Sequence, residues 1–142
     1  MKTKLAKAQA VLLLVAGAML ILVGTFIMAS PVEFYASNDI ELGTNPSLLN
    51  ELKAPAGLLL AAGLFMIGAI FVRRQANTAL WLGALIYLSY AGSRFVSMAL
   101  DGVPAAGLVQ AAALEGLVGL ACLAVLMIRR MPVRKVAPFS TK

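Results

Sequence analysis

Four long apolar runs constrain this chain more than any other feature of its sequence. They cover about residues 10–29, 54–72, 78–100 and 104–128, and each can cross a hydrocarbon core about 30 Å thick at about 1.5 Å per residue. With 61% hydrophobic and only 13% charged residues, the chain falls outside the range of ordinary soluble domains. Residues 1–142 are therefore predicted to form one all-α membrane domain, an up-down-up-down bundle of four transmembrane helices.

The first apolar run follows a basic start, an order that also describes a secretory signal peptide. The run is longer than the usual apolar part of a signal, and Ile27-Met28-Ala29 is a poor cleavage site. We therefore expect a retained span. Gly17 and Gly24 in this run predict close contact between helices, and so do Gly57, Ala61, Gly63 and Gly68 in the second run.

The longest connection, residues 30–53, is rich in acidic residues and turn formers, which indicates an exposed outer loop. Asn45 followed by Pro46 is typical of a helix start, with asparagine as the N-cap and proline at the first helical position. We predict a short interfacial helix from Pro46 through Leu52 that lies on the outer membrane surface. Pro55 is expected to restart or kink the chain where the second span begins.

Basic residues mark one side of the predicted bundle. Ten of the twelve lie there: Lys2, Lys4, Lys7, Arg73, Arg74, Arg129, Arg130, Arg134, Lys135 and Lys142. Five of the six acidic residues lie in or near the other two loops. The positive-inside rule therefore predicts that both termini and a basic tail, residues 129–142, are cytoplasmic, as in a multi-pass protein of a bacterial inner membrane.

The net charge of +6 would suggest nucleic acid in a soluble protein, but its placement beside the spans indicates a topology signal and no nucleic-acid partner. A lipid-headgroup role for the C-terminal basic cluster is a minor addition. The expected partners are the lipid bilayer and either a second copy of the chain or a larger membrane complex.

The chain has no histidine and a single cysteine, Cys122. An intramolecular disulfide, a dithiol redox pair and a His/Cys metal cluster are therefore excluded, and we expect neither a metal nor a cofactor. Cys122 lies in an apolar run, where a small buried hydrophobe is the expected role.

Arg94 and Glu115 are the charged residues that lie well inside apolar sequence. Such a residue costs about 2.5 to 3.5 kcal/mol on insertion scales and marks a functional site or a buried partner. The two lie on either side of the turn Asp101-Gly102-Val103-Pro104, at depths that differ by about 6 Å. Because each side chain leans toward the N-terminus of its own helix, we expect Arg94 and Glu115 to meet in the outer half of the membrane.

Several further polar residues accompany this pair. Tyr87, Tyr90 and Ser97 share a helical stripe with Arg94, while Asp101 and Glu51 are competing partners for its charge. The candidate ligand or ion-pair cluster comprises Arg94, Glu115, Asp101, Glu51, Lys53, Tyr90, Tyr87 and Ser97. A structural ion network, a ligand or ion site built on that network, and a proton relay all stay open.

These residues carry a family resemblance. The stretches concerned are Asn45-Pro46-Ser47-Leu48-Leu49-Asn50-Glu51-Leu52-Lys53 running into Gly57, then Arg94, Ser97, Asp101-Gly102-Val103-Pro104, and Glu115 with Gly119. Over nearly its whole length the chain resembles a family of small bacterial four-span membrane proteins known only as a domain of unknown function, with a looser likeness to DoxX-type proteins. The resemblance implies a four-helix bundle with a polar cluster and no particular substrate. A DoxX-type redox association is not expected, because one thiol cannot run a dithiol relay.

Two functions fit these features. The first is a non-enzymatic membrane protein that binds a small ligand or lipid headgroup, or serves as an accessory to a larger complex. The alternative is a small homodimeric transporter with Glu115 as its coupling acid, although small multidrug-type exporters carry their essential acid in the first span, which is uncharged here. An enzyme is not expected, because Asp101 and Glu115 would be its acid and base and lie about 14 residues apart at different depths.

Overall fold

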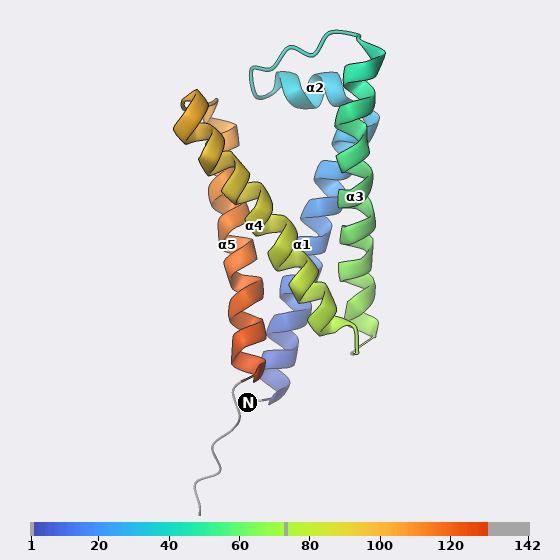
Figure 1. The fold of residues 1–142 in the computed structure, drawn as a ribbon. Helices are drawn as coiled ribbons and strands as arrows, with labels where there is room; N and C mark the ends of the chain where they lie inside the picture. The colour runs from blue at the N-terminus through green and yellow to red at the C-terminus, as the bar shows by residue number, and fades with distance from the viewer. Residues whose placement is uncertain (1, 73, 131–142) are drawn as a thin grey trace, which may run out of the picture.

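The computed structural model describes residues 2–72 and 74–130. Over these residues its regular secondary structure consists of helices joined by connections (Figure 1). The elements are α1 (Lys2–Ala29), α2 (Pro31–Ala36), α3 (Pro46–Phe71), α4 (Ala76–Asp101) and α5 (Ala106–Arg130). Helices α1, α3, α4 and α5 are long and apolar enough to cross a membrane. The predicted all-α bundle of four membrane helices is confirmed, whereas the predicted tail beyond residue 130 lies outside the described residues.

The four long helices form two pairs, α1 with α3 and α4 with α5, and the contacts within a pair are far more extensive than those between pairs. In the first pair the backbones touch at two glycines. A Cβ atom on Gly17 would lie 2.8 Å from the Gly63 carbonyl oxygen, and one on Gly63 would lie 2.6 Å from the Gly17 carbonyl oxygen. The predicted close packing at small residues is therefore present at this crossing. Gly57 and Gly68 face open space instead.

The two pairs are joined by a core near the end of the bundle where α1 begins and α5 ends, which we call the terminal end (Figure 1). Its largest fully buried side chains are Leu13, Met66, Leu80 and Cys122, one from each long helix. Cys122 is thus the small buried hydrophobe that the sequence predicted. Toward the opposite end, which we call the α2 end, α4 and α5 lean away from α1 and α3 (Figure 1).

The prediction of a separate interfacial helix at Pro46–Leu52 is wrong. These residues form the first turns of α3, which continues through Pro55. Asn45 is the predicted N-cap, and its Oδ1 accepts a hydrogen bond from the Ser47 N–H at 2.9 Å. A proline inside a helix leaves the carbonyl four residues earlier unbonded. That residue is Glu51, which is exposed, so water can bond its carbonyl and the helix continues.

The short helix of the first connection is α2, which the sequence analysis had assigned to an exposed loop. It begins at Pro31, immediately after α1, and lies across the end of the bundle opposite the terminal end (Figure 1). Proline at the first helical position is the same start signal as Asn45-Pro46.

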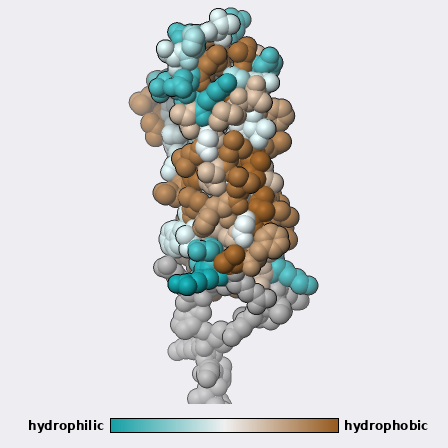
Figure 2. Space-filling view, turned by 90° about the vertical axis from the view of Figure 1, so that its right-hand side faces the viewer, coloured by the Kyte–Doolittle hydropathy of each residue, from teal (hydrophilic) through white to brown (hydrophobic). Residues whose placement is uncertain are grey.

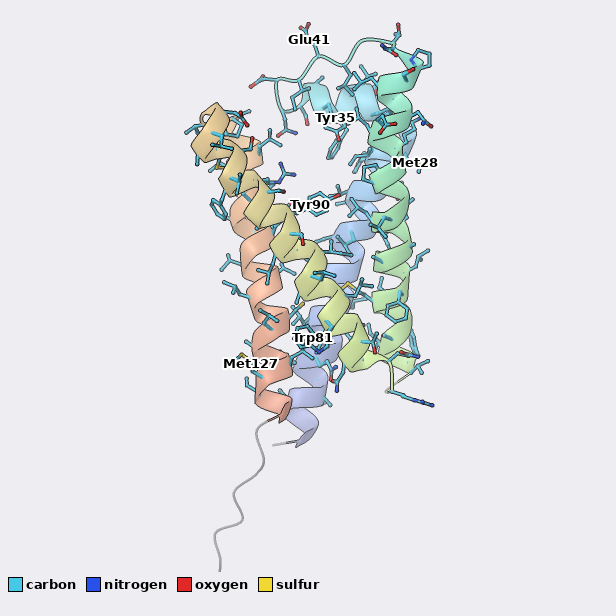
Figure 3. The ribbon with its side chains drawn as sticks, in the orientation of Figure 1. Met28, Tyr35, Glu41, Trp81, Tyr90 and Met127 are labelled. Atoms are coloured by element: carbon cyan, nitrogen blue, oxygen red, sulfur yellow. The ribbon has the colours of Figure 1, made fainter. Side chains whose placement is uncertain are left out.

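The outward surface of the bundle is apolar over most of its length. Leu58, Leu85 and Leu117 are 61%, 68% and 67% exposed, as expected of side chains that face lipid. Figure 2 shows an apolar band with hydrophilic residues at its two ends. Trp81 is 47% exposed and lies toward the terminal end (Figure 3), a position that suits an aromatic residue at the membrane interface.

Candidate functional site

A cavity of about 380 Å³ lies where the two helix pairs separate, and all five helices contribute to its wall. This volume is within the range of about 300 to 1,000 Å³ that is typical of small-molecule sites. Most of its lining is apolar and includes Met19, Leu20, Val23, Ile27, Leu59 and Ile86. The cavity is therefore a mostly apolar space between the spans, and α2 forms part of its wall.

Arg94 and Glu115 lie together in the wall of this cavity. The Nε of Arg94 donates a hydrogen bond to Oε2 of Glu115 at 2.9 Å, which makes an ion pair between α4 and α5. The side chains are 30% and 17% exposed. This ion pair was predicted from the sequence, because side chains on antiparallel helices lean in opposite directions.

Tyr87 and Tyr90 precede Arg94 on the same face of α4, and their hydroxyl groups differ in hydrogen bonding. The buried Tyr87 hydroxyl donates a hydrogen bond to the carbonyl oxygen of Ala16 at 2.7 Å and so ties α4 to α1. Tyr90 is half-buried, and its ring points from α4 into the space between the pairs (Figure 3). Its hydroxyl has no hydrogen-bond partner among the described residues.

Tyr35 is a cavity residue that the sequence analysis missed. It points from α2 toward the space between the pairs (Figure 3), and its ring meets Phe34 edge to face at 5.4 Å between centroids. Burial raises the pKa of the Tyr35 phenol, and the positive charge of Arg94 opposes this only in part. The hydroxyl is therefore protonated at neutral pH and can donate a hydrogen bond. Ser30-Pro31 could have indicated that a helix starts before Tyr35, but not that this helix lies over the cavity.

The loop after α2 closes the cavity against α5. A Cβ atom on Gly107 would lie 2.5 Å from Oδ1 of Asn38, so the Asn38 side chain occupies the space that a side chain at residue 107 would need. Asn38 and Gly107 both line the cavity. This contact joins the α2 segment to the second helix pair.

The remaining predicted cluster residues lie elsewhere. The hydroxyl of Ser97 donates a hydrogen bond to Oδ2 of Asp101 at 2.9 Å, and both side chains are exposed at the end of α4. Glu51 is exposed and Lys53 half-buried on the first turns of α3. None of these four lines the cavity, so the structure brings together Arg94, Glu115, Tyr87 and Tyr90 of the eight predicted residues.

In the part of the chain that the structure describes, no group of three or more His, Cys, Asp or Glu side chains is placed to hold a metal ion. The chemistry that the cavity wall does offer is hydrogen bonding and one opposite-charge pair, set in an apolar surround. That combination can hold a ligand in one orientation.

Comparison with known proteins assigns the chain to a family. The family described as a domain of unknown function, DUF4345, matches residues 8–126. The chain belongs to this family. The matched region includes every residue that lines the cavity of this DUF4345 protein, from Met19 to Glu115. No curated protein and no solved structure matches the chain. The expected membership of an uncharacterised family is thus confirmed, while the looser DoxX likeness and a bacterial origin stay predictions.

Proposed function

We propose that this DUF4345 protein is a non-enzymatic membrane protein that binds a small amphipathic ligand or lipid headgroup between its two helix pairs. The observation that supports this most is the cavity of about 380 Å³ with the Arg94–Glu115 pair in an otherwise apolar wall. Sites for small molecules have this composition, with few polar groups that fix orientation and apolar walls that supply affinity.

A purely structural ion network accounts for the pair but leaves the cavity unexplained. Protein interiors are packed like organic crystals, and an empty apolar space costs stability because its lining loses contacts. At the terminal end the same helices do pack without such a space around Leu80 and Cys122. An occupant that fills the space at the α2 end removes this cost.

The experiment is native mass spectrometry of the protein purified into lipid nanodiscs, with Leu59→Trp and Leu58→Trp as a matched pair. Leu59 is 4% exposed and lines the cavity, whereas its neighbour Leu58 is 61% exposed and faces outward. We expect a copurifying amphiphile on the wild type and on Leu58→Trp, and its loss from Leu59→Trp. Equal retention by both variants, or no bound molecule on the wild type, would contradict the proposal.

We also propose that the protein resides in a bacterial inner membrane with both termini in the cytoplasm. The concentration of basic residues in the terminal segments and in the α3–α4 connection supports this orientation. In this orientation the cavity lies in the outer half of the membrane, where a second copy or a larger complex can share access to it.

A further inference from the structure

We infer that the cavity holds an uncharged, single-chain amphiphile whose head carries hydroxyl and carbonyl oxygens, as in a monoacylglycerol. This inference rests on the proposed function and specifies the chemistry of its ligand. It follows from the hydrogen-bonding groups left over in the cavity wall, from their net charge and from the size of the space.

The polar groups left over in the cavity are mostly donors. Arginine has five N–H donors, and Arg94 uses Nε for Glu115, so its two terminal nitrogens remain. Tyr90 and Tyr35 line the same cavity, and neither hydroxyl has a hydrogen-bond partner among the described residues. A ligand that satisfies these groups must present oxygen acceptors at the α4 side of the cavity.

The ligand head must also suit a wall with no net charge. Arg94 and Glu115 are the charged residues among those that line the cavity, and they neutralise each other. An anionic head on the free terminal nitrogens of Arg94 would lie beside the Glu115 carboxylate, which is 17% exposed and repels it. A cationic head near Glu115 would be repelled by Arg94 in the same way. Since like charges repel strongly in an apolar surround, an uncharged head is preferred.

Size and wall chemistry limit the rest of the ligand. The volume of about 380 Å³ lies near the small end of the range for drug-sized ligands, which is about 300 to 1,000 Å³, so it suits one chain in place of two. Across the cavity from α4, the wall formed by α1 and α3 is apolar at Met19, Val23 and Leu59. An acyl chain can lie along this wall while its head faces Arg94 and Tyr90.

The test offers equimolar monooleoylglycerol and oleate to the protein in phosphatidylcholine nanodiscs and counts retained ligand by native mass spectrometry. The two probes share a chain and differ in the charge of the head. We expect monooleoylglycerol to be retained about tenfold more than oleate, because the Glu115 carboxylate repels the charged head of oleate; a tenfold ratio corresponds to about 1.4 kcal/mol.

Two tyrosine variants separate ligand contacts from fold contacts. Tyr90→Phe removes a hydroxyl that is free in the cavity, so we expect retention of monooleoylglycerol to fall about fivefold, the value of one ordinary hydrogen bond, with no loss of thermal stability. Tyr87→Phe removes a hydroxyl already bonded to Ala16, so we expect a lower unfolding temperature, which Tyr90→Phe should not show.

Preferential retention of oleate, or a Tyr90→Phe variant that retains monooleoylglycerol like the wild type, would overturn this inference. A third result would also overturn it: neither probe is retained, but the wild type still carries a copurified amphiphile that Leu59→Trp loses. In all three cases this inference fails and the proposed function stands. If neither probe nor any copurified molecule is retained, the proposed function fails together with this inference.

Discussion

At the scale of single residues, we expect Arg94 and Glu115 to be energetically coupled, since each alone would leave a charge in an apolar wall. Removing one partner of a buried pair costs about 3 to 5 kcal/mol, and replacing both by apolar residues is often nearly neutral. With side chains that are 30% and 17% exposed, we expect about 3 kcal/mol for Arg94→Leu or Glu115→Leu. Thermal unfolding in detergent should show both losses, and the double variant should recover much of them.

Simple addition of the two single losses would show that Arg94 and Glu115 are not coupled. Ser97→Ala is the matched control, because its hydroxyl bonds Asp101 at the exposed end of the same helix. We expect that variant to unfold like the wild type.

Glu115 is not expected to carry protons across the membrane. A coupling acid must be reachable from both sides, but between Glu115 and the terminal end α5 presents Val118 and Cys122 to the core, both buried. The buried Tyr87 hydroxyl on α4 is already bonded to the Ala16 carbonyl, so it ties two helices together and is not expected to relay protons. In liposomes with an imposed pH gradient, we expect equal proton flux for the wild type and Glu115→Gln. A flux that Glu115→Gln abolishes with the fold intact would favour the homodimeric transporter.

The contact between Arg94 and Glu115 could be predicted from helix geometry, because spacing around a tight turn and the lean of side chains are local properties. Tyr35 could not be found in this way. Its place in the cavity depends on how α2 folds back over the bundle, and no periodicity in the loop sequence encodes that path.

At the scale of helices, the crossing of α1 and α3 depends on the absence of a side chain at Gly63. We expect Gly63→Leu to destabilise the protein by about 1 to 3 kcal/mol, because its Cβ would lie 2.6 Å from the Gly17 carbonyl oxygen. Gly68→Leu, in the same helix, is the control, since nothing lies within 4 Å of its Cβ position. Thermal unfolding of the two variants in one detergent makes the comparison. Equal unfolding temperatures would show that the helices do not cross at Gly63.

The helix start at Asn45-Pro46 could be predicted, but the extent of α3 could not. A proline in the sequence favours a helix break. Whether the helix continues depends on whether the carbonyl four residues earlier finds another hydrogen-bond donor. Here the carbonyl belongs to the exposed Glu51, near the end of a span where water is available. That information is tertiary, so the same pattern was consistent with a separate interfacial helix.

At the scale of the whole molecule, the four spans imply that α1 begins and α5 ends on one side of the membrane (Figure 1). We expect a membrane-impermeant maleimide added outside intact cells to label Thr44→Cys in the loop before α3 and to miss Gln75→Cys in the α3–α4 connection. Both positions are exposed, and the native Cys122 is buried, so the unaltered protein is the unlabelled control. The reverse labelling pattern would invert the proposed orientation.

The α3–α4 and α4–α5 connections are short, which requires α3 to lie near α4 and α4 to lie near α5. The structure adds that α3 packs mainly on α1, to which the longest connection joins it, and only lightly on α4. Loop length restricts which helices can be adjacent, but the glycines at the α1–α3 crossing and the bulk of each helix face decide which neighbours pack tightly. The separation of the pairs, and with it the cavity, therefore could not be predicted from connectivity.

The core around Leu13, Met66, Leu80 and Cys122 holds the two helix pairs together at the terminal end, while the cavity separates them at the other end. The α2 segment contacts α1 and α3, and Asn38 in the loop after it touches the other pair at Gly107. A rotation of one pair about this core would change the width of the cavity. Because an occupant would hold the pairs apart and lateral pressure in the bilayer would push them together, we expect the angle between the pairs to differ between the empty and the occupied protein.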